Sequence, residues 1–181
     1  MNKILADMHT HTIASGHAYA TLTEMCKEAA NKGLEIYGIT EHSSGIPGTC
    51  ADIYFQNLRV VPRDLFGLDL RLGAEINIID YNGTLDLDQK YIDRLDFVIA
   101  GIHSVCYKFG SKEENTAAII NAIKNPNVNI ISHPDDGRCP LDYEALVQAA
   151  KEYHVLLEIN NNALRDKNRK NVKSRCLYVD N

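Results

Sequence analysis

The sequence lacks the features that mark several large classes of protein. No window approaches 18 consecutive apolar residues, which excludes a membrane-spanning helix. There is no block of basic residues and the formal charge is −5, so electrostatics do not favour nucleic-acid binding. The five cysteines form no CxxC pair, which favours reduced thiols over a disulfide framework. The start, MNKILADMHTH, lacks the apolar run of a signal peptide, and we expect a cytoplasmic protein.

What is present is an ordinary globular composition. Of the 181 residues, 45% are hydrophobic and 24% are charged, which is typical of a folded domain and not of a disordered or coiled-coil chain. No linker rich in Ser, Pro or Gly divides the chain. We therefore expect a single domain over residues 1–181.

Short runs rich in Ile, Val and Leu alternate with helical patterns. The runs predict strands at Ile4–His11, Glu35–His42, Leu70–Ile78, Phe97–His103, Val128–His133 and Val155–Asn160. The patterns between them predict helices at Thr21–Asn31, Glu113–Lys124 and Tyr143–Tyr153, the first with the Thr21/Glu24 spacing of a capping box. Asn82-Gly83 suggests a hairpin turn, and the basic stretch 164–176 resembles the start of another helix. Alternating strands and helices are typical of the α/β class with a parallel sheet.

Histidines recur at the ends of these strands. His9 and His11 are two residues apart on the first strand, so both rings should project from one face. The steps from His11 to His42, Glu75, His103 and His133 are 31, 33, 28 and 30 residues, and each step is one βα unit. In a parallel barrel the carboxyl ends of the strands gather on one rim. We therefore expect five imidazoles and one carboxylate at that rim.

This pattern predicts a metal site with nitrogen and oxygen ligands. A single histidine at a strand end is more often a hydrogen-bonded surface or core residue than a ligand. Five of them over four units of one barrel argue against that simpler interpretation. Imidazoles with a carboxylate suit zinc, manganese or iron, and a carboxylate can bridge two ions.

Several other polar residues are weaker candidates for a role at the predicted metal site. His17 lies in the loop after the first strand and is a plausible further ligand, whereas His154 lies at a helix end on the opposite rim and is expected to be structural. Asp7 could orient a ligand histidine. Glu158 and Asn160 share a face at the end of the sixth strand and could contribute hydrogen bonds.

Six segments in order resemble the PHP (polymerase and histidinol phosphatase) family. They are ADMHTHTIASGHAYATLTE, GITEH, GAEINI, AGIH, ISHPD and LEINN, between about Lys3 and Asn162. They are most similar to the small stand-alone bacterial phosphatase branch. The resemblance implies a distorted (β/α)7 barrel and a trinuclear metallo-phosphoesterase.

The resemblance also implies how the ligands are shared. His9 and His11 would bind the first ion, and His17 and His42 would bind the third. Glu75 would bridge the first ion to a second ion held by His103 and His133. Zinc is favoured, with manganese or iron as alternatives.

In this branch an N-x-R-x-x-P-R segment lies near the site. Here it reads NLRVVPR and contains Arg59 and Arg63. Guanidinium groups bind phosphate bidentately, so these two are candidate phosphate contacts. The alternative is that both are solvated surface charges.

One family motif is missing. The last barrel strand of the family carries G-S-D-x-H, whose Asp completes the first metal position and whose His completes the third. The segment is absent here, and a further βα unit of about 30 residues after Asn160 would pass the last residue, Asn181. We therefore expect a barrel truncated after about six strands, with a ligand missing from two of three metal positions. Its open sheet edge could pair with a second copy of the chain.

The favoured function is hydrolysis of a small phosphate ester by a metal-activated water, with no membrane or nucleic-acid partner. Two alternatives stay open. The chain could be a metal-binding remnant with little or no catalysis, or a nuclease-type phosphodiesterase, although its acidic charge argues against the second.

Overall fold

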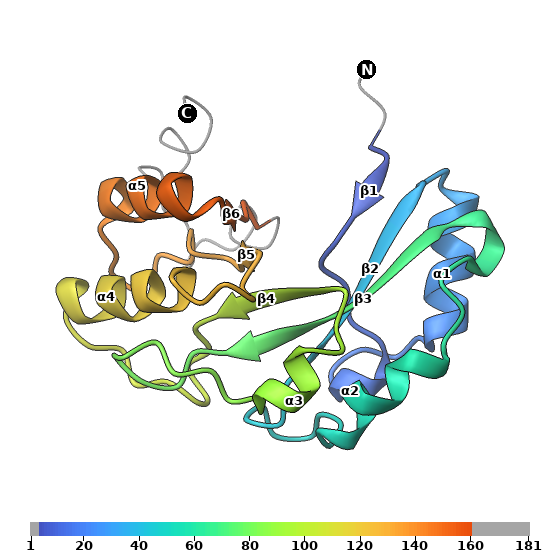
Figure 1. The fold of residues 1–181 in the computed structure, drawn as a ribbon, viewed down its shortest axis with the longest axis horizontal. Coiled ribbons are helices and arrows are strands. Elements are labelled where there is room, and N and C mark those ends of the chain that lie inside the picture. Colours follow the sequence, from blue (N-terminus) through green and yellow to red (C-terminus); the bar gives the residue numbers. More distant parts are fainter. Residues whose placement is uncertain (1–3, 161–181) are drawn as a thin grey trace. The chain divides into compact units, whose positions relative to one another are not determined.

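The computed structural model describes residues 4–160, and its strands are hydrogen-bonded in sequence order (Figure 1). The strands are β1 (Ala6–Asp7), β2 (Ile36–His42), β3 (Asp69–Asn77), β4 (Phe97–Gly101), β5 (Ile130–Ile131) and β6 (Leu156–Leu157). The pairs β1–β2, β2–β3, β4–β5 and β5–β6 are parallel. The expected α/β class is confirmed, and each of the six strands overlaps the segment predicted for it.

Helices follow the strands. They are α1 (Leu22–Asn31), α2 (Ile53–Asn57), α3 (Gln89–Ile92), α4 (Lys112–Ile123) and α5 (Tyr143–Tyr153), with short 3-10 helices η1 (Ile13–Ser15), η2 (Leu58–Val60) and η3 (Leu65–Gly67). The capping box predicted for α1 is present. The Thr21 hydroxyl accepts a hydrogen bond from the backbone N–H of Glu24, and the Glu24 carboxylate accepts one from the backbone N–H of Thr21. Ser111 and Glu114 form the same box on α4.

The described residues form two compact units. One contains the chain up to Ile76 together with Leu87–Val98, and the other contains Asn77–Asp86 and the chain from Ile99 onward. The expectation of one domain over residues 1–181 stays a prediction. We describe each unit by itself.

The first unit is built on β2 and β3. The side chains of Ile39, Leu70 and Leu72 are fully buried there. A Cβ on Gly38 would lie 2.7 Å from the carbonyl oxygen of Met8, so only glycine allows the first segment to come this close. The register pairs His42 with Glu75, which brings the ends of β2 and β3 together.

The first strand is much shorter than the predicted Ile4–His11. Beyond Asp7, side chains replace part of the backbone ladder. Thr10 donates its N–H to the Thr40 hydroxyl at 3.1 Å and its own hydroxyl to the carbonyl of Gly38. His9 and His11 therefore follow the strand rather than lying on it.

The second unit contains β5, β6 and the helices α4 and α5, which pack against each other (Figure 1). Ile123, Ile131 and Leu146 are fully buried in its core. The hairpin suggested at Asn82-Gly83 is present, with an antiparallel bridge between Ile78 and Leu85 and a positive φ of 78° at Gly83.

Two further expectations concern helices. The helix start expected in 164–176 lies outside the described residues. Within residues 4–160, the structure contains no helix that is both long and apolar enough to cross a bilayer.

Candidate metal centre

Three imidazoles surround one carboxylate oxygen in the first unit. The Oε2 atom of Glu75 lies 3.1 Å from His9 Nε2, 3.3 Å from His11 Nε2 and 3.1 Å from His42 Nδ1. The Glu75 side chain is only 1% exposed, and the three histidine side chains are 8–17% exposed. Two of the rings, His9 and His11, come from the segment after β1 and the third, His42, ends β2, and they converge on Glu75 in β3.

The distances from Glu75 Oε2 to the three nitrogens match those between two ligands of one small cation. Ligands bound to zinc at about 2.0–2.1 Å in a tetrahedron lie about 3.3–3.4 Å from each other. The separations in this cluster are 3.1–3.3 Å. Neutral imidazole with carboxylate is also the donor set that suits zinc, manganese or iron. The residues present therefore fit a divalent metal.

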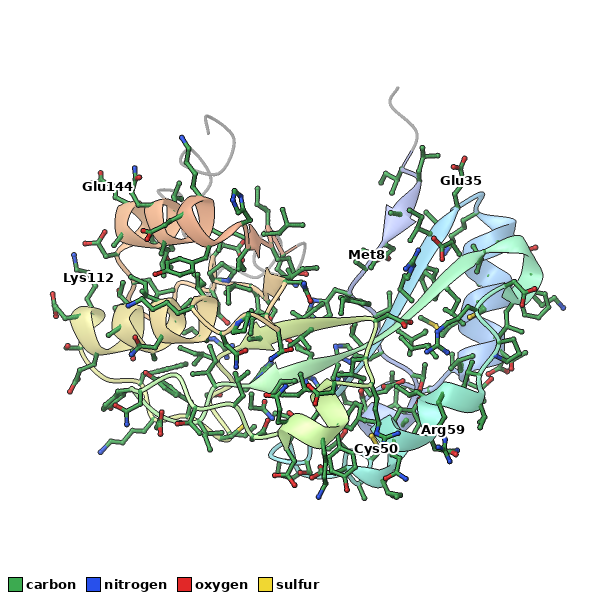
Figure 2. All side chains as sticks on the ribbon, in the orientation of Figure 1. Met8, Glu35, Cys50, Arg59, Lys112 and Glu144 are labelled. Atoms are coloured by element: carbon green, nitrogen blue, oxygen red, sulfur yellow. The ribbon has the colours of Figure 1, made fainter. Side chains whose placement is uncertain are left out.

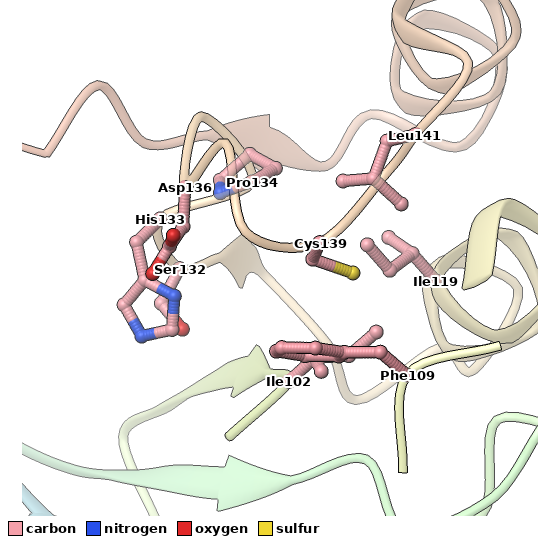
Figure 3. A pocket seen from close by; sticks show the side chains of 9 residues that line it. All are labelled: Ile102, Phe109, Ile119, Ser132, His133, Pro134, Asp136, Cys139 and Leu141. Carbon is pink, nitrogen blue, oxygen red and sulfur yellow. The ribbon is translucent and has the colours of Figure 1, made fainter. Parts of the chain in front are cut away.

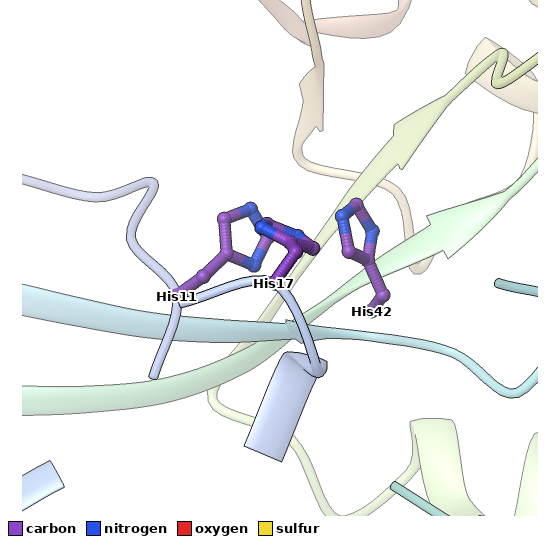
Figure 4. Close-up of side chains that lie close together, drawn as sticks. All are labelled: His11, His17 and His42. Carbon is purple, nitrogen blue, oxygen red and sulfur yellow. The ribbon is translucent and has the colours of Figure 1, made fainter. Parts of the chain in front are cut away.

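His17 extends this cluster. His11, His17 and His42 offer ligand nitrogens within 4.8 Å of one another, and their rings turn toward a common point (Figure 4). The His11 and His42 rings are stacked with centroids 4.4 Å apart. His17 is exposed, which leaves this group open to solvent on one side.

A buried network behind the cluster orients His11. The hydroxyl of Ser15 donates to Glu41 Oε2, accepts the backbone N–H of His42 at 3.1 Å, and lies 3.0 Å from His11 Nδ1. Because the single proton of this hydroxyl goes to Glu41, the proton between Ser15 and His11 must come from Nδ1. The lone pair of His11 is then on Nε2, the atom that faces Glu75.

The second unit contains the other two predicted ligands. His103 Nε2 and His133 Nε2 lie 3.2 Å apart, which again is the separation expected of two ligands on one ion. His133 has a φ of 35°, in the left-handed region that is unfavourable for a residue with a side chain. Its N–H donates to Glu158 Oε2 at 2.7 Å, and this bond holds the backbone turn.

The strand-end residues Glu158 and Asn160 form the hydrogen bonds that the sequence suggested. Asn160 donates its side-chain N–H to Glu158 at 3.3 Å and its backbone N–H to Asp135 Oδ2 at 3.2 Å. Burial raises the pKa of Asp135, which is 2% exposed. The Glu158 N–H still donates to the Ile131 carbonyl at 3.0 Å, but the N–H groups of His133 and Asn160 donate to side chains, which explains why β6 is shorter than the predicted Val155–Asn160.

The two arginines occupy different environments. Arg59 is exposed on η2 (Figure 2). Arg63 instead pairs with Asp96 at 2.9 Å and donates to the carbonyls of Leu58 and Val61. Their role as phosphate contacts stays a prediction.

Two further expectations concern single residues. His154 is exposed and ends α5 as its C-cap with a φ of 58°, in agreement with a structural role. Asp7 accepts the backbone N–H of His9 at 3.4 Å, so this contact orients the chain before His11 rather than an imidazole ring.

An apolar pocket adjoins His133 in the second unit (Figure 3). Its lining residues are Ile102, Phe109, Ile119, Ser132, His133, Pro134, Asp136, Cys139 and Leu141. Burial raises the pKa of the Cys139 thiol to about 12, so the thiol stays neutral at physiological pH. Cys139 therefore adds no charge to the pocket beside His133, and Asp136 supplies the carboxylate of its lining.

Sequence reasoning missed the residues behind the histidines. Ser15 and Glu41 support His11, and Asn77 accepts from His103 Nδ1 at 2.7 Å. Ser15 gives no periodic signal. Glu41 and Asn77 could have been noticed, because an acidic or amide residue in a buried strand needs a hydrogen-bonded partner.

Comparison with known proteins agrees with this fold and cluster. The PHP domain matches residues 7–164, and the chain therefore belongs to the PHP family. A probable phosphatase of Acetivibrio thermocellus is 48% identical over 161 residues, which are 89% of this chain and 67% of that protein. A probable phosphatase of Caldicellulosiruptor saccharolyticus is 50% identical over 167 residues, 91% of this chain and 70% of the relative.

A solved structure is also similar. It is the crystal structure of a histidinol phosphate phosphatase from Lactococcus lactis subsp. lactis in complex with zinc, L-histidinol and phosphate. The TM-score is 0.57 at 19% identity, with 91% of this chain and 76% of that chain covered. At this identity the similarity shows the fold alone, which is an α/β fold of the PHP type.

Proposed function

We propose that this chain hydrolyses phosphate monoesters with the help of bound divalent metal ions. The observation that carries the proposal is the convergence of three imidazole nitrogens on one buried carboxylate oxygen at 3.1–3.3 Å. Membership of the PHP family and the similarity to probable phosphatases support the same reaction class.

The proposed ligands form two groups. His9, His11, His17, His42 and Glu75 would hold ions in the first unit, and His103 and His133 would hold one in the second. The nitrogen-rich donor set favours zinc, with manganese or iron as alternatives.

Bound ions would lower the pKa of a water molecule and neutralise the charge of the phosphoryl oxygens. The chain's own residues would contribute orientation and charge. Ser15 holds the His11 ring with its Nε2 lone pair toward the site, and Glu75 brings a negative charge that favours cation binding. Arg59 is exposed and free to approach an anionic substrate, whereas Arg63 would first have to leave Asp96.

The test compares turnover with and without metal. The full chain, stripped with a chelator, is assayed with p-nitrophenyl phosphate before and after zinc or manganese is added. We expect turnover only with metal, and at least a hundredfold loss in Glu75→Gln and His42→Ala. The matched control is His154→Asn, which removes an imidazole outside both clusters and keeps a residue that tolerates a positive φ.

Each alternative function has its own outcome. Metal binding without turnover would favour a non-catalytic remnant, and faster hydrolysis of bis-p-nitrophenyl phosphate than of the monoester would favour a phosphodiesterase. Absence of both bound metal and turnover would overturn the proposal.

A further inference from the structure

Asn77 connects a carboxylate to one of the proposed ligands. It is the last residue of β3 and is fully buried. Its side-chain Nδ2 donates to Asp86 Oδ2 at 2.7 Å, and its Oδ1 lies 2.7 Å from His103 Nδ1. Its backbone N–H donates to the other carboxylate oxygen of Asp86 at 2.9 Å.

The direction of these hydrogen bonds is fixed by chemistry. A carboxylate can only accept, so Asn77 must turn its amino group toward Asp86 and its oxygen toward His103. The amide oxygen also can only accept, so His103 must carry its proton on Nδ1. A neutral imidazole with a proton on Nδ1 has its lone pair on Nε2.

We propose that Asp86 and Asn77 are positioning residues that fix His103 in the Nδ1–H tautomer, with the Nε2 lone pair ready to bind metal. The inference rests on the proposed metal role of His103. It assigns to Asp86 and Asn77 a function that neither motif spacing nor strand-end position indicates. Partners behind a ligand histidine typically change metal affinity 10- to 100-fold.

The arrangement also explains the close approach of the two rings. His103 Nε2 lies 3.2 Å from His133 Nε2. His103 Nε2 carries a lone pair in this tautomer. The contact is then either a hydrogen bond that His133 Nε2 donates to His103 Nε2, or two nitrogen lone pairs that bind the same metal ion. Both cases need the Nδ1–H tautomer at His103, and the second is the metal-bound state.

The variant Asp86→Asn tests this order of donors and acceptors while keeping the shape of the side chain. Asp86 now accepts at both oxygens, and the new amide can accept at only one. The backbone N–H of Asn77 cannot turn, so the new amino group should face the Asn77 side chain. The Asn77 amide should then rotate, its amino group should face His103 Nδ1, and the ring should move its proton to Nε2.

A second exchange should restore the original tautomer. In the double variant Asn77→Asp with Asp86→Asn, the amide at position 86 accepts the backbone N–H and donates to the new carboxylate at position 77. That carboxylate accepts again from His103 Nδ1. The charge-matched control is Asp88→Asn, which removes an exposed carboxylate that pairs with Lys90.

The readout is the tautomer of His103 in the metal-free full chain. Histidine-labelled protein at about pH 8.5, above the ordinary histidine pKa of about 6.5, shows by long-range ¹H–¹⁵N correlation which ring nitrogen carries the proton. His103→Gln assigns the signals. We expect Nδ1–H in the unchanged chain, in Asp88→Asn and in the double variant, and Nε2–H in Asp86→Asn.

Zinc affinity provides a second measurement. We expect Asp86→Asn to bind zinc 10- to 100-fold more weakly at this site, and the double variant to recover. Nε2–H in the unchanged chain, or an unaltered tautomer in Asp86→Asn, would overturn the inference. If Asp86→Asn does not fold, the His103 tautomer measured in the unchanged chain and in the double variant still tests the inference.

The outcome separates this inference from the proposed function. Nδ1–H at His103 in a chain that neither binds metal nor hydrolyses phosphate esters would overturn only the function. Turnover in a chain with Nε2–H at His103 would overturn only the inference.

Discussion

Glu75 is a charged residue in an environment that ordinarily excludes charge. Its side chain is 1% exposed, and burial of an unpaired carboxylate is strongly unfavourable. The three imidazole nitrogens around Oε2 would be co-ligands of Glu75 in a metal-bound chain. A buried carboxylate surrounded by imidazoles is therefore unfavourable for stability on its own and a candidate metal site.

Ser15 gives a prediction at the scale of one residue. Ser15→Ala removes the acceptor of the His42 N–H and the partner of His11 Nδ1. We expect zinc affinity in the first unit to fall 10- to 100-fold, because His11 is no longer oriented. The buried N–H left without this acceptor should also lower the free energy of unfolding by about 1–3 kcal/mol.

Calorimetric titration of the stripped protein with zinc measures the affinity, and urea denaturation measures the stability. The matched control is Ser44→Ala, at an exposed serine in the turn after β2. Zinc affinity in Ser15→Ala equal to that in Ser44→Ala would show that the hydroxyl does not orient His11.

At the scale of elements, β2 shows what alternation can and cannot predict. His42 faces Glu75, whereas its neighbour Glu41 points to the other side of the strand and contacts Thr12 and Ser15. The spacing of βα units was enough to predict His42 and Glu75 at neighbouring strand ends. The partner of Glu41 depends on a turn 26 residues away, and no local pattern encodes such a contact.

Strand lengths were the least predictable element property. The apolar runs predicted strands up to His11, His133 and Asn160, but β1, β5 and β6 contain two residues each. At these strand ends, backbone N–H groups donate to side-chain oxygens instead of to a neighbouring strand. The acceptors are Thr40, Glu158 and Asp135. The replacements at Thr10 and His133 occur at strand ends that carry candidate ligands, where polar side chains are concentrated.

The start of α1 gives a prediction about a helix cap. Thr21→Ala removes the hydroxyl that caps α1, and loss of such a cap should lower the free energy of unfolding by about 1 kcal/mol at neutral pH. The backbone and hydroxyl of Thr21 hold the pKa of Glu24 below its usual value of 4.5. A depressed carboxyl pKa stabilises the fold above the unfolded-state pKa, and this contribution is lost as the pH falls through the folded-state pKa.

Urea denaturation at neutral and acidic pH measures both effects. We expect the difference between Thr21→Ala and the unchanged chain to be larger at pH 7 than below the folded-state pKa of Glu24. Thr23→Ala, at an exposed position inside the helix, is the control. A difference that does not change with pH would contradict the capping-box contribution of Glu24.

At the scale of the whole molecule, charge and site chemistry depend on each other. The formal charge is −5 with neutral histidines, so the chain as a whole repels an anionic phosphate ester. The candidate ligand sets consist of imidazoles and one carboxylate and so add no positive charge while the histidines are neutral. The proposed reaction therefore needs bound cations to offset the charge of its substrate. The sequence predicts this need, because the need depends only on the net charge and on the residue types at the strand ends.

Metal removal should therefore change the stability of the whole chain. An ion that binds the folded state stabilises it by about 2.7 kcal/mol when its concentration is 100 times its dissociation constant. For a chain of this size, we expect zinc to raise the thermal midpoint by roughly 5–10 °C over the chelated protein. Calcium should have a smaller effect, because it prefers oxygen ligands.

Variants locate the source of this stabilisation. The zinc-dependent shift should become smaller in Glu75→Gln and remain unchanged in His154→Asn, which lies outside both clusters. The midpoints are compared at equal protein concentration and heating rate, since an irreversible transition depends on the rate. Equal midpoints with and without zinc would show that the converging imidazoles do not hold an ion in the folded chain.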